Sequence, residues 1–221
     1  MSLLQLKPRP LTREVSDFRD DRLFIVACDD TFAPSQYFNF FKLDRVKVHV
    51  VPTIDGTSHA EHVLERLMSY EHREDDELWM LLDTDHCIQG GHVKSYIRAL
   101  KDANNKGVNV AVSRSCFEVW LLLHHLDESA VILLRNATET EIALRQTLDS
   151  YNKSSLQEEH YPLSAVVLAC QRAEKLDQAV KGTHIPKSVT SRVYKLWKSI
   201  VNGASPLQLP PELLVLRSVG H

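Results

Sequence analysis

One segment of the chain combines a buried strand with a pair of carboxylates. Residues 78–82 are five consecutive apolar residues, and the acidic residues Asp83 and Asp85 come immediately after them. An apolar run without polar alternation is typical of a strand that is buried on both faces, as in the middle of a parallel sheet. Ligands of open α/β sheets bind beyond the carboxyl ends of the strands. The segment therefore predicts an α/β fold with a site at Asp83 and Asp85, which point to the same side if the chain stays extended.

A second apolar segment ends in the same way. Residues 23–28 are apolar, and Asp29 and Asp30 follow them. Further strands and helices are predicted to alternate along the chain, which favours parallel strands with right-handed connections. We therefore expect a central parallel sheet of about four strands flanked by helices. The other predicted elements are strands over 46–51 and 108–113, and helices from Pro34, over about 58–72, over about 92–104 and over 116–125.

The character of the sequence changes near residue 138. From there the apolar residues recur at helical spacing with more polar faces, which predicts a helical C-terminal part. The expected helices lie near 138–150, 163–181 and 188–202. The expected organisation is an N-terminal arm (1–21), an α/β core (22–136), a helical C-terminal part packed on that core (137–202), and a docked or loose tail (203–221).

Composition excludes several classes of protein. The formal net charge is -3, so any binding of nucleic acid must rest on a local basic patch or on metal ions. The four cysteines are far apart and lack metal-site spacing, which indicates small buried side chains in a reducing cytoplasm. No apolar stretch approaches the roughly 18 residues of a membrane span, and the N-terminus lacks a signal-peptide pattern. A cytoplasmic protein is expected.

Three carboxylates at two strand ends suggest a metal site. Asp29, Asp83 and Asp85 supply the oxygen ligands that a hard divalent ion such as Mg²⁺ or Mn²⁺ requires. Without an ion their clustering is unfavourable, because two like charges about 4 Å apart repel by roughly 4 kcal/mol at an effective dielectric constant near 20. In the alternative interpretation, Asp83 and Asp85 cap the turn or helix that follows the strand.

Other ionisable residues are weaker catalytic candidates. Glu118 lies in the otherwise apolar segment 116–125, where an unpaired carboxylate is costly, so it requires a partner or a metal. A buried pair with an arginine or histidine and a direct catalytic role both remain possible. His86, His124 and His125 are candidate bases, although histidines without ligand spacing are more often surface or core groups.

Four basic residues are candidates for contact with nucleic acid. Arg114 follows the strand over 108–113, and its planar guanidinium suits a phosphate. Lys187, Arg192 and Lys195 form a modest basic face on or beside the helix predicted over 188–202. Amphipathic packing of that helix explains its pattern without nucleic acid.

Three segments of the chain resemble the RloB-like family. That family typically shows Cys-Glu-Gly with Thr-Glu and Tyr-Phe after it, then Asp-x-Asp, then Ser-Asn-Pro-x-Phe-Glu-x-Trp-Leu-Leu-Leu-His. A weaker resemblance continues to Pro186, Thr190 and Val193 to Leu196, so about residues 20–200 are covered. The matching segments here are Cys28-Asp29-Asp30 with Tyr37-Phe38, Leu82-Asp83-Thr84-Asp85, and Val112 to His124 with Phe117-Glu118-Val119-Trp120 within it.

The resemblance implies a Toprim-like catalytic fold and metal-dependent phosphodiester chemistry. It also implies a role in bacterial anti-phage defence, often beside a partner ATPase. Asp29 takes the place of the Toprim glutamate, which is expected to act in proton transfer or metal binding, and Asp83 and Asp85 match the Asp-x-Asp pair.

The sequence departs from the family pattern near these residues. Asp30 replaces the glycine, Ala33-Pro34 replaces Thr-Glu, and Arg114-Ser115 replaces Asn-Pro. Because aspartate tolerates turn geometry, the loop after Asp29 is still expected to form. Two functions are compatible with this pattern: a metal-dependent nuclease that cuts DNA or RNA as a defence effector, and a catalytically inactive partner subunit that binds an ATPase.

Overall fold

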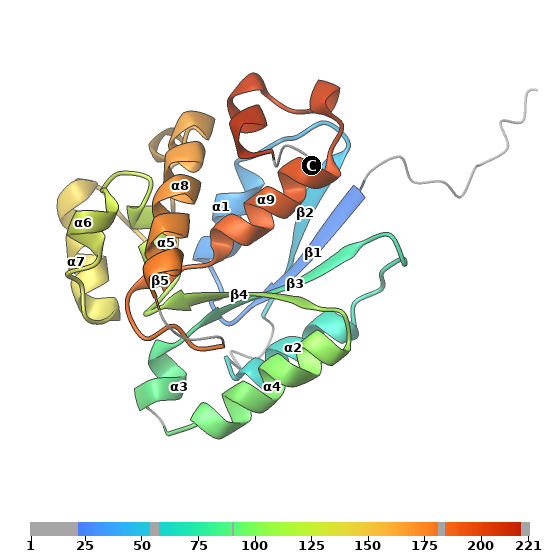
Figure 1. Cartoon of the computed structure of the whole chain (residues 1–221), viewed down its shortest axis with the longest axis horizontal. Coiled ribbons are helices and arrows are strands. Elements are labelled where there is room, and N and C mark those ends of the chain that lie inside the picture. Colours follow the sequence, from blue (N-terminus) through green and yellow to red (C-terminus); the bar gives the residue numbers. More distant parts are fainter. Residues whose placement is uncertain (1–21, 54–57, 90, 181–183, 218–221) are drawn as a thin grey trace, which may run out of the picture.

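The computed structural model describes residues 22–53, 58–89, 91–180 and 184–217. The predicted N-terminal arm, residues 1–21, lies outside this range. Within it the chain forms one five-stranded sheet with helices on both faces (Figure 1). The predicted α/β fold is therefore confirmed.

The sheet has the strand order β2-β1-β3-β4-β5. The first four strands in this order are parallel, as expected, and β5 pairs antiparallel with β4. The two-residue strand β5 lies where the sequence pattern predicted the start of a helix, so that part of the prediction is wrong. Its backbone instead pairs with the end of β4, and the helix begins at Val193. The strands are β1 (Arg22–Cys28), β2 (Val46–Val51), β3 (Glu77–Asp83), β4 (Asn109–Arg114) and β5 (Thr190–Ser191).

The apolar segment before Asp83 occupies the centre of the sheet. β3 pairs on one side with β1, where Cys28 is opposite Leu81, and on the other with β4, where Asp83 is opposite Ser113. Its residues 78–82 are all buried, as their uninterrupted apolar character predicted. The carboxyl ends of β1 and β3 consequently lie side by side at one edge of the sheet.

Helices cover both faces of the sheet (Figure 1). One face packs on α2 and α4, and the other packs on α1, α5, α8 and α9. The helices are α1 (Ala33–Asn39), α2 (Ala60–Met68), α3 (Asp85–Gln89), α4 (Val93–Asn105), α5 (Glu118–Leu122), α6 (Glu128–Val131), α7 (Ala137–Thr147), α8 (Leu163–Ala179) and α9 (Val193–Gly203), with short 3₁₀ segments η1 (Glu158–His160), η2 (Pro206–Gln208) and η3 (Pro211–Leu216).

The short helix α5 lies inside the larger of the two cores. All five of its residues are buried, and Trp120 has no exposed surface. The ring of Tyr37 on α1 lies 6.1 Å from that of Trp120 and 6.4 Å from that of Trp197 on α9. These aromatic contacts join elements far apart in sequence, so the helical C-terminal part completes the core around α5.

The described part of the C-terminal tail is docked. Leu213 and Leu216 of η3 are buried, and η3 packs on α8 and α9. All four cysteines are buried and unpaired, as the sequence predicted. Among the described residues, no helix is both long enough and apolar enough to cross a membrane.

Candidate functional site

Asp29 and Asp83 meet at the carboxyl ends of β1 and β3. Asp29 is the residue after β1, and Asp83 is the last residue of β3. The backbone N–H of Asp83 donates a hydrogen bond of 2.8 Å to Oδ2 of Asp29. Both side chains are partly buried. The two aspartates that were predicted to share a site are therefore neighbours, with one oxygen of Asp29 already engaged.

Asp85 lies near them, but the backbone that carries it is helical rather than extended as expected. The chain leaves the extended conformation after Asp83, and Asp85 begins α3, where a carboxylate is favoured in the first turn. Its N–H donates to the carbonyl of Ser115 at 3.2 Å. Asp29, Asp83 and Asp85 nevertheless line one open pocket of about 400 Å³.

The carboxyl groups of Asp29 and Asp83 hold their protons unusually tightly. Burial is the largest cause that raises the pKa of Asp29 to about 7, and the nearby charge of Asp30 adds to it, against the hydrogen bond from Asp83. Burial also raises the pKa of Asp83 well above its ordinary value, helped by the charges of Asp29 and Glu118. A cation bound among these groups would stabilise their ionised forms and so act against both shifts.

The chemistry of these donors fits a hard divalent ion, although no ligand set is assembled in advance. Carboxylate oxygens are the ligands that Mg²⁺ and Mn²⁺ prefer. Over the residues that the structure describes, no three His, Cys, Asp or Glu side chains are grouped so that they could hold a metal ion. Binding of an ion by Asp29, Asp83 and Asp85 therefore requires their side chains to turn toward a common point.

Glu118 has a partner, and that partner is a lysine. Oε1 of Glu118 lies 3.2 Å from Nζ of Lys153 and accepts a hydrogen bond of 3.1 Å from the hydroxyl of Tyr151. The expected partner was an arginine or a histidine, so this expectation is wrong. The loop after α7 supplies both partners, and nothing near Glu118 in the sequence indicated it.

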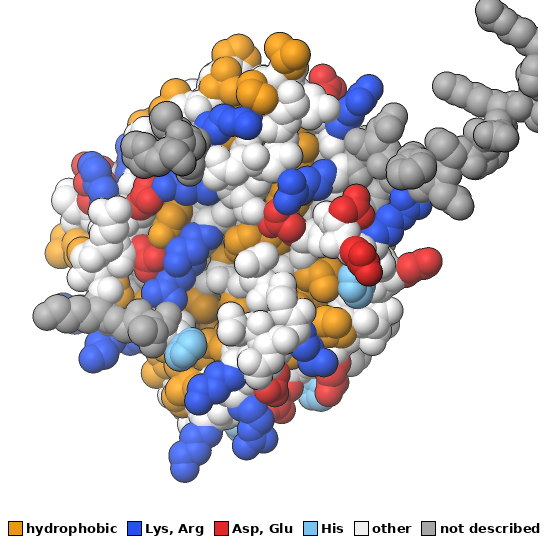
Figure 2. Space-filling model, turned by 45° about the vertical axis from the view of Figure 1, so that its right-hand side comes forward, with side chains coloured by type: hydrophobic (Ala, Val, Ile, Leu, Met, Phe, Trp, Pro, Cys, Tyr) orange, Lys and Arg blue, Asp and Glu red, His pale blue; other side chains and the backbone are white. Residues whose placement is uncertain are grey.

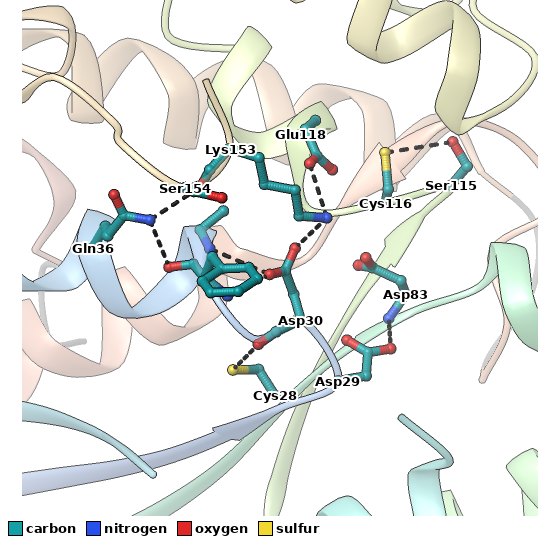
Figure 3. Close-up of polar contacts among 12 residues, drawn as sticks. Cys28, Asp29, Asp30, Gln36, Asp83, Ser115, Cys116, Glu118, Lys153 and Ser154 are labelled. Atoms are coloured by element: carbon teal, nitrogen blue, oxygen red, sulfur yellow. Dashed lines mark hydrogen bonds and ion pairs between the residues drawn. The ribbon is translucent and has the colours of Figure 1, made fainter. Parts of the chain in front are cut away.

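Asp30 joins the same network (Figure 3). Its Oδ2 lies 2.6 Å from Nζ of Lys153. Its Oδ1 accepts hydrogen bonds from the backbone N–H groups of Phe32 at 2.8 Å and Ala33 at 3.2 Å, at the start of α1. The loop after Asp29 thus forms with aspartate at the position of the family glycine, and the aspartate side chain stabilises it.

Lys153 lies between these two acids as a permanent cation. Burial by itself lowers the pKa of Lys153, but the charges of Glu118 and Asp30 raise it above its ordinary value. The lysine is therefore protonated at any physiological pH. It lines the same pocket as Asp29 and Asp83.

The four basic residues predicted to contact nucleic acid do not line this pocket. Arg192 is 9% exposed and pairs with Asp177 at 2.8 Å, so its guanidinium is occupied inside the protein. Arg114 donates to the backbone carbonyl of Pro186 at 2.6 Å. Lys195 is more exposed but lies 3.5 Å from Asp177. Lys187 is exposed.

On the face seen in Figure 2, Lys and Arg side chains are interspersed with Asp and Glu rather than gathered into one positive surface. Basic residues of α9 likewise pair with acidic residues of α8, as Lys198 does with Glu174 at 2.5 Å. The basic face predicted near α9 is therefore partly neutralised by acids of α8.

Two of the candidate histidine bases, His124 and His125, do not line the acidic pocket. His124 is buried, its Nε2 lies 3.0 Å from the hydroxyl of Tyr37, and its Nδ1 lies 2.9 Å from the carbonyl oxygen of Trp120. Burial lowers its pKa to about 3. His125 lines a different pocket. The side chain of His86 lies outside the described part of the structure.

Asp29 and Asp83 also line a second, smaller pocket on the opposite face of the sheet, beside α2 and α4. Tyr96 of α4 lines it, is 5% exposed, and has a buried hydroxyl without a hydrogen-bond partner among the described residues. Sequence reasoning did not single out Tyr96, because its spacing on α4 is that of an ordinary core residue.

The fold and the strand-end carboxylates define a mixed α/β protein with an acidic pocket at the carboxyl edge of a largely parallel sheet. The family model described as "RloB-like protein" matches residues 24–200. The chain therefore belongs to the RloB-like family. No curated protein and no solved structure matches it.

Proposed function

We propose that the protein is a metal-dependent nuclease that hydrolyses phosphodiester bonds of DNA or RNA with Mg²⁺ or Mn²⁺. The observation that carries this proposal is the meeting of Asp29, Asp83 and Asp85 in one pocket at the carboxyl ends of β1 and β3. The raised pKa of Asp29 supports it, because strongly shifted pKa values are concentrated at functional sites.

In this proposal Asp29, Asp83 and Asp85 hold the divalent ion. A bound ion stabilises charge on a phosphate and lowers the pKa of a water molecule. Asp29 is held beside Asp83 by the backbone hydrogen bond, so it is placed to bind the ion or to take up a proton. Glu118 acts with Asp30 to hold Lys153 at the wall of the pocket.

The wider role rests on the family resemblance. We propose an effector of a bacterial anti-phage defence system that acts in the cytoplasm and assembles with an ATPase. The four buried, unpaired cysteines agree with a reducing compartment. Co-purification of the untagged protein with a tagged ATPase encoded beside it is the direct test of that assembly.

Cleavage assays test the nuclease proposal. The purified protein is incubated with plasmid DNA, single-stranded DNA and tRNA in Mg²⁺, Mn²⁺ or EDTA. Asp83→Asn keeps the size of the side chain and removes its charge, and Asp102→Asn makes the same change at an exposed position of α4. We expect metal-dependent cleavage that Asp83→Asn abolishes and Asp102→Asn retains. Cleavage that survives in Asp83→Asn would remove the strand-end site from the mechanism.

A second function is favoured by a specific observation. Lys153 already neutralises part of the charge of Asp30 and Glu118, and no metal ligand set is assembled among the described residues. A catalytically inactive subunit that binds an ATPase would need these ion pairs for stability and would need no metal site. Absence of divalent-ion binding in calorimetry, together with complex formation by Asp83→Asn, would favour this function over the first.

A further inference from the structure

The pocket at the strand ends is strongly acidic, yet its proposed substrate is an anion. Six carboxylates and one ammonium group lie among its described lining residues. A phosphodiester that enters such a pocket needs positive charge close to its non-bridging oxygens. The ammonium group of Lys153 is the cation that these lining residues supply. The six acidic residues are Asp29, Asp30, Asp83, Asp85, Glu118 and Glu141.

Two buried acids fix the position of this ammonium group. Nζ of Lys153 lies 2.6 Å from Oδ2 of Asp30 and 3.2 Å from Oε1 of Glu118. The side chains of Asp30 and Glu118 are only 3% and 6% exposed, whereas that of Lys153 is 44% exposed. The acids therefore hold the lysine from the protein side and leave much of its side chain open to solvent.

The backbone around Lys153 is fixed as well. Nε2 of Gln36 on α1 donates a hydrogen bond of 3.0 Å to the carbonyl of Lys153. Oε1 of the same side chain accepts one of 2.9 Å from the N–H of Leu156. Tyr151, two residues before the lysine, donates to Glu118. The loop is thus tied to α1 and α5 at several points, so Lys153 is ordered before any ligand arrives (Figure 3).

An ammonium group has three N–H donors, and two carboxylates engage Lys153. We infer that Lys153 is the phosphate-binding residue of this site and donates its third N–H to a non-bridging oxygen of a nucleic-acid phosphodiester. The inference deepens the proposed nuclease function and rests on it for the nature of the ligand. It places a contact with substrate on the loop after α7, whereas Asp83 lies at the end of β3.

A comparison with Arg192 separates this role from a structural one. Arg192 also pairs with a buried acid, but its side chain is 10% exposed and its partner Asp177 is 9% exposed. Both members of that pair are largely buried, as in a structural ion pair. Lys153 pairs with acids that are equally buried but is itself open to the pocket.

Binding of a short fluorescein-labelled single-stranded oligonucleotide, DNA or RNA, tests the inference in Ca²⁺ by fluorescence anisotropy at several salt concentrations. The variant Lys153→Met removes the charge, and Lys153→Arg retains it. Because Lys153→Met leaves two buried acids without their cation, Lys153→Met combined with Asp30→Asn and Glu118→Gln provides a variant without that strain. Lys175→Met is the matched control, since Lys175 is 65% exposed and pairs with Glu128 away from the pocket.

We expect the two methionine variants to bind about tenfold more weakly or worse. Their plots of log affinity against log salt should be shallower by about 0.7, the loss of one phosphate contact on a single strand. Lys153→Arg and Lys175→Met should keep the wild-type slope. A purely structural role of Lys153 would not change that slope.

The outcomes separate the two proposals. If the folded Lys153 variants bind with the affinity and salt slope of Lys175→Met, the phosphate-binding role of Lys153 is wrong, whatever the protein cleaves. If the expected pattern appears but the wild type cleaves nothing in Mg²⁺ or Mn²⁺, Lys153 binds phosphate and the nuclease function fails. If the wild type binds no oligonucleotide at all, both proposals fail.

Discussion

Replacement of Asp29 by asparagine should stabilise the metal-free protein above neutral pH. The pKa of Asp29 rises from 3.8 to about 7 on folding. Asparagine carries no charge, and its side-chain oxygen can still accept the hydrogen bond from Asp83. Asp29→Asn therefore removes the cost of burying the charge and keeps the contact that orders the strand ends.

The magnitude follows from the two pKa values. Below about pH 4, Asp29 is protonated in both the folded and the unfolded protein, so its titration has no effect on stability. Between about pH 4 and pH 7 the unfolded chain loses the proton and the folded chain keeps it, so the free energy of unfolding falls as pH rises. At about 1.4 kcal/mol per pKa unit, the loss reaches up to about 4 kcal/mol above pH 7.

Thermal unfolding in EDTA between pH 4 and pH 8 measures this difference. For a chain of this size about 4 kcal/mol corresponds to a rise in Tm of roughly 8–16 °C for Asp29→Asn at pH 8, shrinking toward zero near pH 4. Asp102→Asn at an exposed position of α4 should show no such dependence on pH. An Asp29→Asn variant that is no more stable than the wild type at pH 8, or equally stabilised at every pH, would refute the reasoning.

Three further predictions concern the core and the ion pairs. Trp120→Ala should lower the free energy of unfolding by about 3–5 kcal/mol in denaturant titrations, because Trp120 is fully buried. Arg192→Met should destabilise the protein by less than the roughly 3–5 kcal/mol of a fully unpaired buried charge, because Asp177 keeps Lys195 at 3.5 Å and the hydroxyl of Tyr194 at 3.0 Å. In oligonucleotide-binding assays it should leave affinity unchanged. His124 should stay neutral down to about pH 4 in NMR titrations, because burial lowers its pKa to about 3.

The central position of β3 and the acidic strand ends could be predicted because both depend on local sequence. Residues 78–82 are apolar without interruption, which is sufficient to place their strand in the middle of a sheet. Parallel neighbours then bring Asp29 and Asp83 to one edge. The extended geometry expected through Asp85 was wrong, because the chain turns into α3 there.

The cation of the site could not be predicted. Lys153 lies in a polar segment between two predicted helices, where nothing distinguishes it from a solvated loop residue. It reaches Asp30 and Glu118 only because α7 and the loop after it fold back across α5. The prediction for Arg192 met the opposite difficulty. Its positive charge suggested contact with nucleic acid, but its guanidinium forms an ion pair with Asp177 of α8. Both outcomes depend on contacts between distant parts of the chain.

Calorimetric titration of Mn²⁺ into the protein at pH 8 tests the central claim most directly. Asp29, Asp83 and Asp85 should bind the ion at this pH, since Asp29, whose pKa is about 7, is mostly ionised at pH 8. We predict saturable binding by the wild type and by Asp102→Asn, and its loss in Asp83→Asn. Absence of binding by the wild type, or equal binding by Asp83→Asn, would contradict the assignment of a divalent-ion site to the strand ends.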